Sequence, residues 1–218
     1  MQSNANFIQL SADNLDNLLL DLGGVLVSID FTRMANAFEK LGISKFHEMY
    51  SHQQQIELFD RFDRGQVSED NFRTALLNLC SCRHITAEQF DQAWNQIIVD
   101  VPDAVLNCLR HLAQQFNLFV LSNTNSIHIR FLYRYLFEVK GVHNFEAYFK
   151  KVYYSYQMGY RKPEVAIFEQ VLVDAKIDPQ RTLFIDDTPA NIEAAKLLGF
   201  QVFLMPKGKL LSDVIACE

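Results

Sequence analysis

The sequence LLLDLGGVLV, at residues 18–27, decides the fold of this chain. Three consecutive leucines form a short apolar run that ends at Asp21, and Gly23 and Gly24 follow. Such a run is typical of a strand buried on both faces, as in a parallel sheet covered by helices. Asp21 would then present its carboxylate at the edge of the sheet, where the two glycines let backbone N–H groups approach an anion. In isolation, the same segment would favour an aspartate in a turn or at a helix N-cap.

Four further apolar runs repeat this pattern, at residues 118–121, 152–154, 182–185 and 202–204. Segments with apolar residues at helical spacing lie between or after them, at residues 104–114, 165–175 and 190–198. Alternating strands and helices predict an α/β fold with a doubly wound parallel sheet. Ligands of such folds bind beyond the carboxyl ends of the strands, so we expect the functional site there.

Polar residues follow three of these runs, where the strands are expected to end. In chain order they are Ser122 and Asn123, then Lys162, then Asp186 and Asp187. The hydroxyl and amide groups suit phosphate oxygens, and the lysine supplies a positive charge. Adjacent carboxylates repel each other without a cation, and hard oxygen ligands suit Mg²⁺. With Asp21 as an attacking carboxylate, these residues predict a site for phosphoryl transfer.

The stretch at residues 31–98 breaks the alternation, because it contains no convincing strand. Helix-like segments are expected at residues 33–41, 54–62, 68–79 and 87–98. Ser68 is expected to cap the third of them, since two acidic residues follow it at the positive helix end. We interpret this stretch as a helical bundle that covers the carboxyl end of the sheet. The predicted domains are an α/β core at residues 1–30 and 100–218 and a helical cap at residues 31–99.

Composition limits the classes of partner. The chain has 218 residues, with 20 basic and 26 acidic side chains and a net charge of −6. An acidic surface argues against nucleic-acid and anionic-membrane binding. No apolar run is long enough to span a bilayer, and the N-terminus lacks the pattern of a secretory signal. The four cysteines show no paired framework, which favours thiols in a cytoplasmic protein. Nothing in the sequence indicates the oligomeric state.

Four motifs in this order resemble the haloacid dehalogenase-like superfamily of hydrolases, which form an aspartyl phosphate. They are DLGGVLV, LSNTN, GYRKP and FIDDTPANIEAAKLLG, and they span residues 21–199. Each motif alone is weak evidence, whereas four in order at expected strand ends are specific. The resemblance implies a Rossmann-like core with a helical cap, Mg²⁺ as cofactor, and hydrolysis of the phosphoric monoester of a small metabolite.

The resemblance also assigns the residues that handle phosphate. It makes Asp21 the nucleophile and makes Ser122 and Lys162 the phosphate-binding side chains. Gly24 and Asn123 are expected to add amide contacts to the substrate phosphate.

The metal ligands follow from the same resemblance. Asp186 is expected to bind Mg²⁺ together with Asp21, and the backbone carbonyl of Gly23 is expected to reach the ion and to lie next to the substrate. Asp187 supports the site directly or through water. Asn191 is expected to steady the metal-site loop, with a plain helix-capping role as the alternative.

Gly23 departs from the usual pattern of the superfamily. Its phosphatases usually carry a second aspartate two residues after the nucleophile, which protonates the leaving group and later activates water. Its loss predicts a preference for leaving groups of low pKa, such as the anomeric oxygen of a hexose 1-phosphate. DLGGVLVSIDF, with LSNTN and DDTPANI, is also similar to a bacterial subgroup that includes an α-D-glucose-1-phosphate phosphatase and has glycine at this position.

The leading hypothesis is therefore a Mg²⁺-dependent phosphatase of a sugar phosphate. The alternative is a catalytically weak regulatory or binding protein that lost turnover through Gly23, although the retained Asp21 favours an enzyme. Phosphomutase activity is disfavoured because it needs the missing aspartate. Dehalogenation is disfavoured because haloacid dehalogenases need no metal and lack the adjacent acidic pair.

Other polar residues near the motifs have simpler interpretations. His47 and His52 in the cap, and His128 after LSNTN, are interpreted as surface histidines, although each could face the substrate. Asp30 could supply the missing acid, but its position before a helix-like segment favours an N-cap.

Overall fold

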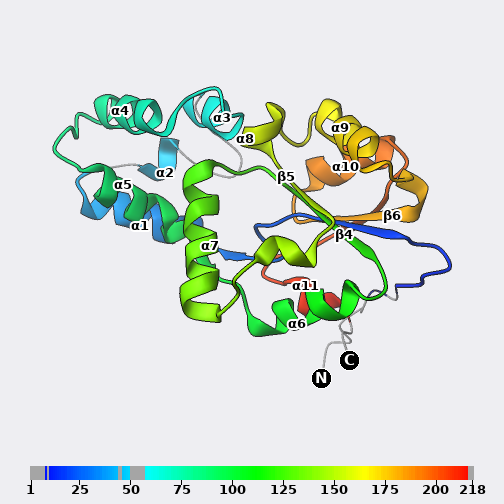
Figure 1. Cartoon of the computed structure of the whole chain (residues 1–218). Helices are drawn as coiled ribbons and strands as arrows, with labels where there is room; N and C mark the ends of the chain where they lie inside the picture. The colour runs from blue at the N-terminus through cyan, green and yellow to red at the C-terminus, as the bar shows by residue number, and fades with distance from the viewer. Residues whose placement is uncertain (1–7, 9, 44–45, 50–56, 216–218) are drawn as a thin grey trace, which may run out of the picture.

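A parallel sheet forms the centre of the molecule (Figure 1). The structure is a computed structural model that describes residues 8, 10–43, 46–49 and 57–215. Its five-stranded sheet has the order β5-β4-β1-β6-β7, and all neighbouring strands are parallel. The strands are β1 (Asn17–Leu20), β4 (Asn117–Ser122), β5 (Lys151–Tyr154), β6 (Thr182–Asp186) and β7 (Gln201–Leu204). The doubly wound α/β fold predicted from the sequence is confirmed.

Side chains of β1 alternate between two hydrophobic cores, one on each face of the sheet. Leu18 and Leu20 pack into the core beneath α6 (Asp103–Leu112), α7 (Ser126–Lys140) and α11 (Leu211–Val214). Leu19 packs into the core beneath α9 (Val165–Ala175) and α10 (Pro189–Leu197). Because all three leucines are fully buried, the strand is apolar at every position rather than at alternate ones.

The cap consists of helices with an aromatic core of their own (Figure 1). The helices are α1 (Phe31–Lys40), α2 (Phe46–Met49), α3 (Glu57–Asp63), α4 (Glu69–Leu79) and α5 (Ala87–Trp94). Phe62 stacks on Phe72 with ring centroids 3.9 Å apart, and Phe59 stacks on Trp94 at 5.7 Å. These aromatic residues exclude water from the interior of the cap.

Side chains cap two of these helices as the sequence indicated. Asp30 accepts a hydrogen bond from the Thr32 backbone N–H at 2.8 Å, at the start of α1. Ser68 accepts one from the Asn71 backbone N–H at 3.3 Å, at the start of α4. Asp30 is thus an N-cap, as interpreted.

Two short strands connect the cap to the core. β2 (Ser28–Ile29) and β3 (Ile98–Asp100) pair antiparallel where the chain enters and leaves the cap. The predicted helix at residues 87–98 is therefore too long. It ends at Trp94, continues as one 3-10 turn, η1 (Asn95–Ile97), and becomes β3, because β2 supplies backbone partners there.

Short elements complete the core. They are η2 (Phe145–Tyr148), α8 (Ser155–Met158) and η3 (Pro179–Arg181). The turn that follows α3 packs closely against α8. Gly65 has a φ of +68°, and a Cβ atom there would lie 2.1 Å from the backbone oxygen of Tyr156. Glycine is required at this contact between cap and core.

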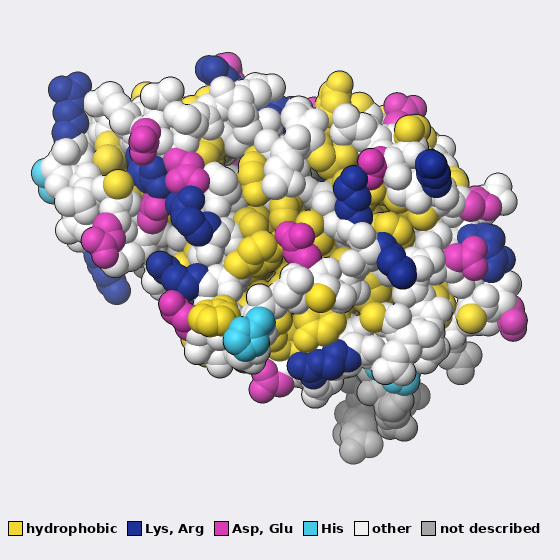
Figure 2. Space-filling view, viewed as in Figure 1, with side chains coloured by type: hydrophobic (Ala, Val, Ile, Leu, Met, Phe, Trp, Pro, Cys, Tyr) yellow, Lys and Arg dark blue, Asp and Glu magenta, His cyan; other side chains and the backbone are white. Residues whose placement is uncertain are grey.

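The structure can be compared with the expectations about membrane spans, surface charge and cysteines. None of the helices that the structure describes combines the length and apolar character needed to cross a membrane. On the face in Figure 2, basic and acidic side chains are interspersed. Cys80 and Cys82 are free thiols, but Cys108 forms a disulfide, so the expectation of unpaired cysteines is wrong at Cys108.

Candidate active site

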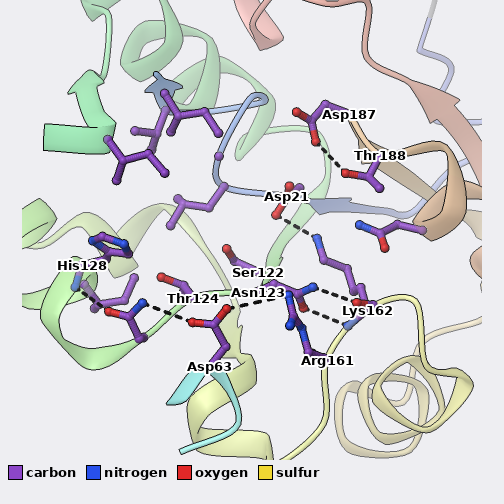
Figure 3. A pocket seen from close by; sticks show the side chains of 18 of the residues that line it. Asp21, Asp63, Ser122, Asn123, Thr124, His128, Arg161, Lys162, Asp187 and Thr188 are labelled. Atoms are coloured by element: carbon purple, nitrogen blue, oxygen red, sulfur yellow. Dashed lines mark hydrogen bonds and ion pairs between the residues drawn. The ribbon is translucent and has the colours of Figure 1, made fainter. Parts of the chain in front are cut away.

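The sequence-predicted site residues meet at the carboxyl edge of the sheet. Asp21 directly follows β1, Ser122 is the last residue of β4, and Asp186 is the last residue of β6. Lys162 lies in the loop between α8 and α9. Asp21, Ser122 and Lys162 line a cavity of about 490 Å³ (Figure 3). The parallel register brings the strand ends to one edge, since Leu20 pairs with both Val120 and Ile185.

Lys162 lies between two carboxylates at the buried end of this cavity. Its Nζ is 2.8 Å from Asp21 Oδ1 and 2.6 Å from Asp186 Oδ2, and it donates a hydrogen bond to the backbone oxygen of Leu121 at 2.7 Å. Burial alone would lower the pKa of Lys162, but the two carboxylates raise it above its ordinary value. The ammonium group therefore stays charged.

Asn123 holds the backbone of Lys162 in place. Its Nδ2 donates to the Lys162 carbonyl oxygen at 2.8 Å, and its Oδ1 accepts from the Lys162 N–H at 2.8 Å. Both ends of this side-chain amide therefore position Lys162. Asn123 also lines the cavity, where its contact with a substrate phosphate stays a prediction.

Three carboxylates cluster beside the lysine. Asp21, Asp186 and Asp187 each offer one oxygen, and these oxygens all lie within 4.8 Å of one another. Burial raises the pKa of Asp21 to about 7, with Lys162 opposing the rise and the two other carboxylates adding to it. One ammonium group cannot balance three carboxylates, so the donor set fits a divalent cation with hard oxygen preference.

The loop after β6 fixes the orientation of this cluster. Asn191 donates from Nδ2 to both carboxylate oxygens of Asp186, at 3.0 and 3.1 Å. The Thr188 N–H donates to Asp186 Oδ1 at 2.8 Å, and the Thr188 hydroxyl donates to Asp187 Oδ1 at 3.2 Å. The expectation that Asn191 steadies this loop agrees with these contacts.

The two glycines after Asp21 have different structural roles. Gly24 has a φ of +74°, and a Cβ atom there would lie 2.3 Å from Asp187 Oδ2. Glycine at this position therefore permits close approach of the loop to Asp187. Gly23 lines the cavity, and a Cβ atom there would lie 3.3 Å from Ile29 Cδ1. Its lack of a side chain leaves no acid beside the nucleophile on this loop.

A second polar group lines the opposite side of the cavity, and the sequence analysis did not assign it to the site. Figure 3 shows Asp63 and His128 on the side away from Asp187, with Ser122 and Thr124 between. Asp63 ends α3 in the cap and is buried. No motif named in the sequence analysis marks Asp63, which directly follows the expected helix at residues 54–62.

The position of His128 differs from the surface position interpreted from the sequence. The sequence placed it on the surface, but it lies in the first turn of α7, is buried, and lines the cavity. Its ring stacks on Trp94 of the cap, with centroids 5.1 Å apart. His52 lies outside the described residues, as does the side chain of His47.

Ion pairs join the cap to the loop that carries Lys162. Arg161 Nη1 is 3.0 Å from Asp60 Oδ1, and its Nη2 is 3.7 Å from Asp63 Oδ2. Arg64 pairs with Asp60 at 2.7 Å and donates to Glu164 Oε2 at 2.9 Å. The cap therefore contacts the core on both sides of Lys162.

This fold and this arrangement of carboxylates, lysine and serine define a class of protein. A family model described as haloacid dehalogenase-like hydrolase matches residues 15–199. The chain belongs to this family, in its phosphatase branch.

Related proteins from this family show which enzymes the chain resembles. The chain is 34% identical over 194 residues to a D-ribitol-5-phosphate phosphatase of Bacteroides thetaiotaomicron, covering 89% of this chain and 93% of that protein. It is similar to the crystal structure of a wild-type enzyme of the family from the same organism in complex with magnesium and inorganic phosphate, with a TM-score of 0.83, 35% identity, and coverage of 89% and 96%. A family hydrolase structure from Porphyromonas gingivalis gives a TM-score of 0.82 with 31% identity, and coverage of 89% and 93%.

Proposed function

We propose that this protein is a Mg²⁺-dependent phosphatase that hydrolyses the phosphate monoester of a small sugar or polyol through an aspartyl phosphate on Asp21. One observation carries the proposal. Lys162 Nζ lies between Asp21 and Asp186, with Asp187 completing a carboxylate cluster at the end of a cavity. A related phosphatase that is 34% identical, and a related structure that holds magnesium and phosphate, support it.

Each residue has a defined part in the proposed reaction. The Asp21 carboxylate attacks phosphorus, an oxygen–phosphorus bond forms, and the bond from phosphorus to the leaving alcohol breaks. Lys162 and Ser122 hold the phosphate oxygens and offset their charge. Asp21, Asp186, Asp187 and the Gly23 carbonyl would hold Mg²⁺, whose positive charge would offset that of the phosphate while the anionic carboxylate approaches. Water then attacks the acyl phosphate and releases phosphate, which restores Asp21.

The finer choice of substrate has two candidates. A D-ribitol-5-phosphate phosphatase among the relatives favours a pentitol phosphate. The absence of an acid at Gly23 favours a leaving oxygen of low pKa, as in a hexose 1-phosphate. Both are small hydroxylated esters. We also propose that residues 31–99 act as a cap over this site, and that the enzyme works in the cytoplasm on a small molecule rather than on nucleic acid.

A small panel of esters tests the proposal. The panel contains D-ribitol 5-phosphate, α-D-glucose 1-phosphate, D-glucose 6-phosphate and p-nitrophenyl phosphate, each with Mg²⁺ and with EDTA. We expect phosphate release only with Mg²⁺, and none from the Asp21→Asn protein, because an amide cannot form the acyl phosphate. Activity of Asp21→Asn equal to that of the wild type would refute the mechanism. Tight binding of an ester without turnover would instead favour a regulatory or binding protein.

A further inference from the structure

The cavity has two chemically different ends. Asp21 and Lys162 lie on one side of it in Figure 3, and His128 lies on the other. Apolar side chains also line this cavity, namely Val27, Ile29, Ile97, Ile98, Ile129 and Leu132. A phosphate held by Lys162 would direct the organic part of its ester toward this second end.

His128 lines the cavity and carries a buried ring nitrogen without a hydrogen-bond partner. Its Nδ1 lies 2.9 Å from Asn95 Oδ1, an acceptor, so the ring proton belongs on Nδ1 and Nε2 keeps its lone pair. Nε2 is shielded from solvent and has no hydrogen-bond partner in the described part of the chain. Burial lowers the pKa of His128 to about 3, so the ring is neutral at pH 7. A buried polar atom without a partner is uncommon and calls for one.

Asp63 adds a second acceptor on the same side of the cavity. Its Oδ1 accepts one hydrogen bond from Asn125 Nδ2 at 3.2 Å, and its Oδ2 lies 3.7 Å from Arg161. Asn125 cannot turn its oxygen toward Asp63, because that oxygen already accepts from Trp94 Nε1 and the His128 backbone N–H. A carboxylate accepts about four hydrogen bonds, so Asp63 can accept further donors.

We propose that His128 Nε2 and the Asp63 carboxylate form a subsite that accepts hydrogen bonds from hydroxyl groups in the organic part of the substrate. The proposal rests on the phosphatase function above and adds to it the chemical class that the cavity selects. Both groups only accept, so the ligand must donate, and the hydroxyls of a sugar or polyol do so. A carboxylate or a second phosphate only accepts, so it can hydrogen-bond to neither group, and the subsite disfavours it.

A pair of esters that differ at one carbon tests this selection. D-Glucitol 6-phosphate and 6-phospho-D-gluconate share their phosphate and inner hydroxyls, but C1 is a hydroxymethyl group in one and a carboxylate in the other. We expect kcat/KM to favour the glucitol ester by ~10-fold, because the carboxylate cannot donate the hydrogen bond that the hydroxymethyl group donates. Asp63→Asn should reduce this preference, because its amide can donate to the carboxylate and keeps the size of the side chain.

Substitutions of His128 test the other acceptor. His128→Phe keeps a flat ring to stack on Trp94 and removes Nε2. We expect it to lower kcat/KM for D-ribitol 5-phosphate and α-D-glucose 1-phosphate by ~10-fold while p-nitrophenyl phosphate changes by less than ~2-fold, since that ester has no hydroxyl to bind. His128→Gln keeps an acceptor and should restore part of the loss. His84→Phe, at an exposed position of the cap, is the matched control.

The outcomes separate failure of the subsite from failure of the phosphatase function. A similar loss on all three esters would assign His128 a structural role and refute the subsite, as would no loss on the hydroxylated esters. If the wild type hydrolyses p-nitrophenyl phosphate but neither hydroxylated ester, the subsite is refuted and the phosphatase stands. If no ester is hydrolysed, the proposed function fails, and calorimetric binding of D-ribitol 5-phosphate to Asp21→Asn decides the subsite. Weaker binding after His128→Phe is added would support it, and equal binding would overturn it.

Discussion

Restoring an acid at Gly23 tests how the leaving group obtains its proton. The backbone there lacks the positive φ that requires glycine, so an L side chain is compatible with the loop. A Cβ atom would lie 3.3 Å from Ile29 Cδ1, the end of a flexible side chain that needs to move by only a few tenths of an ångström. Because Gly23 lines the cavity beside Asp21, the added carboxyl of Gly23→Asp can reach the reacting ester.

The expected gain depends on the ester. General acid catalysis contributes ~10²–10⁴-fold, and we expect the lower end, ~10²-fold or about 2.7 kcal/mol of barrier, because no neighbouring group holds the new carboxyl. This gain applies to esters whose alcohol leaves with difficulty, such as D-ribitol 5-phosphate and D-glucose 6-phosphate. p-Nitrophenyl phosphate should change little, since nitrophenolate leaves without a proton.

A graded series of aryl and alkyl phosphates provides the measurement. In the wild type, log kcat/KM should rise steeply as the pKa of the leaving group falls, and Gly23→Asp should flatten that slope. Gly23→Asn has nearly the same size and carries no acidic proton, so it separates catalysis from crowding against Ile29. A wild-type series that is already flat would show that another group, or a water molecule, protonates the leaving oxygen, and the reasoning from Gly23 would be refuted.

Three further predictions concern the rest of the site. Lys162→Ala should lower kcat/KM far more than Ser122→Ala, because Ser122 contributes one neutral hydrogen bond of roughly 0.5–1.5 kcal/mol; steady-state kinetics with the reverse ranking would contradict this. Gly24→Ala should weaken Mg²⁺ binding, measured by calorimetry, because its Cβ would displace the Asp187 carboxylate. Burial raises the pKa of Asp63 from 3.8 to about 6, so the folded state holds its proton more tightly than the unfolded state. The stability that this group contributes is present below pH 4, and it falls by up to about 3 kcal/mol as the pH rises through 6. The Asp63→Asn protein should therefore become more stable relative to the wild type between pH 4 and pH 7. Urea unfolding measures this difference.

The sheet, and the meeting of the candidate site residues at one of its edges, could be predicted because each depends on local sequence. The run at Leu18–Leu20 is apolar at every position because both faces of β1 are covered. A short, continuously apolar run of this kind is typical of a strand in a parallel sheet. Asp21, Ser122 and Asp186 each stand at the end of such a run. Since parallel strands end at one edge, their proximity followed without any tertiary information.

The second end of the cavity could not be predicted in this way. Asp63 and His128 are 65 residues apart in the sequence and meet at the cavity only after the cap has packed on the core. The ring of His128 is fixed by Trp94 and Asn95, which come from the helical segment at residues 31–99. No periodicity marks a residue whose burial depends on contacts with another segment of the chain, so a surface position was the natural interpretation.

The two ends of the cavity therefore depend on different parts of the chain. The proposed phosphate end is built on the sheet, where Lys162 is held by Asn123 and by the carboxylates at the strand ends. The other end depends on the cap, which supplies Asp63 and the groups that orient His128. Changes in the cap are then expected to alter which organic group is accepted while leaving the attack on phosphorus intact. Ion pairs on both sides of Lys162 couple the two parts, because Arg161 reaches Asp63 from the residue next to the lysine. Packing of the cap helices thus completes the proposed organic end of the cavity and holds the loop that carries Lys162 through the same contacts.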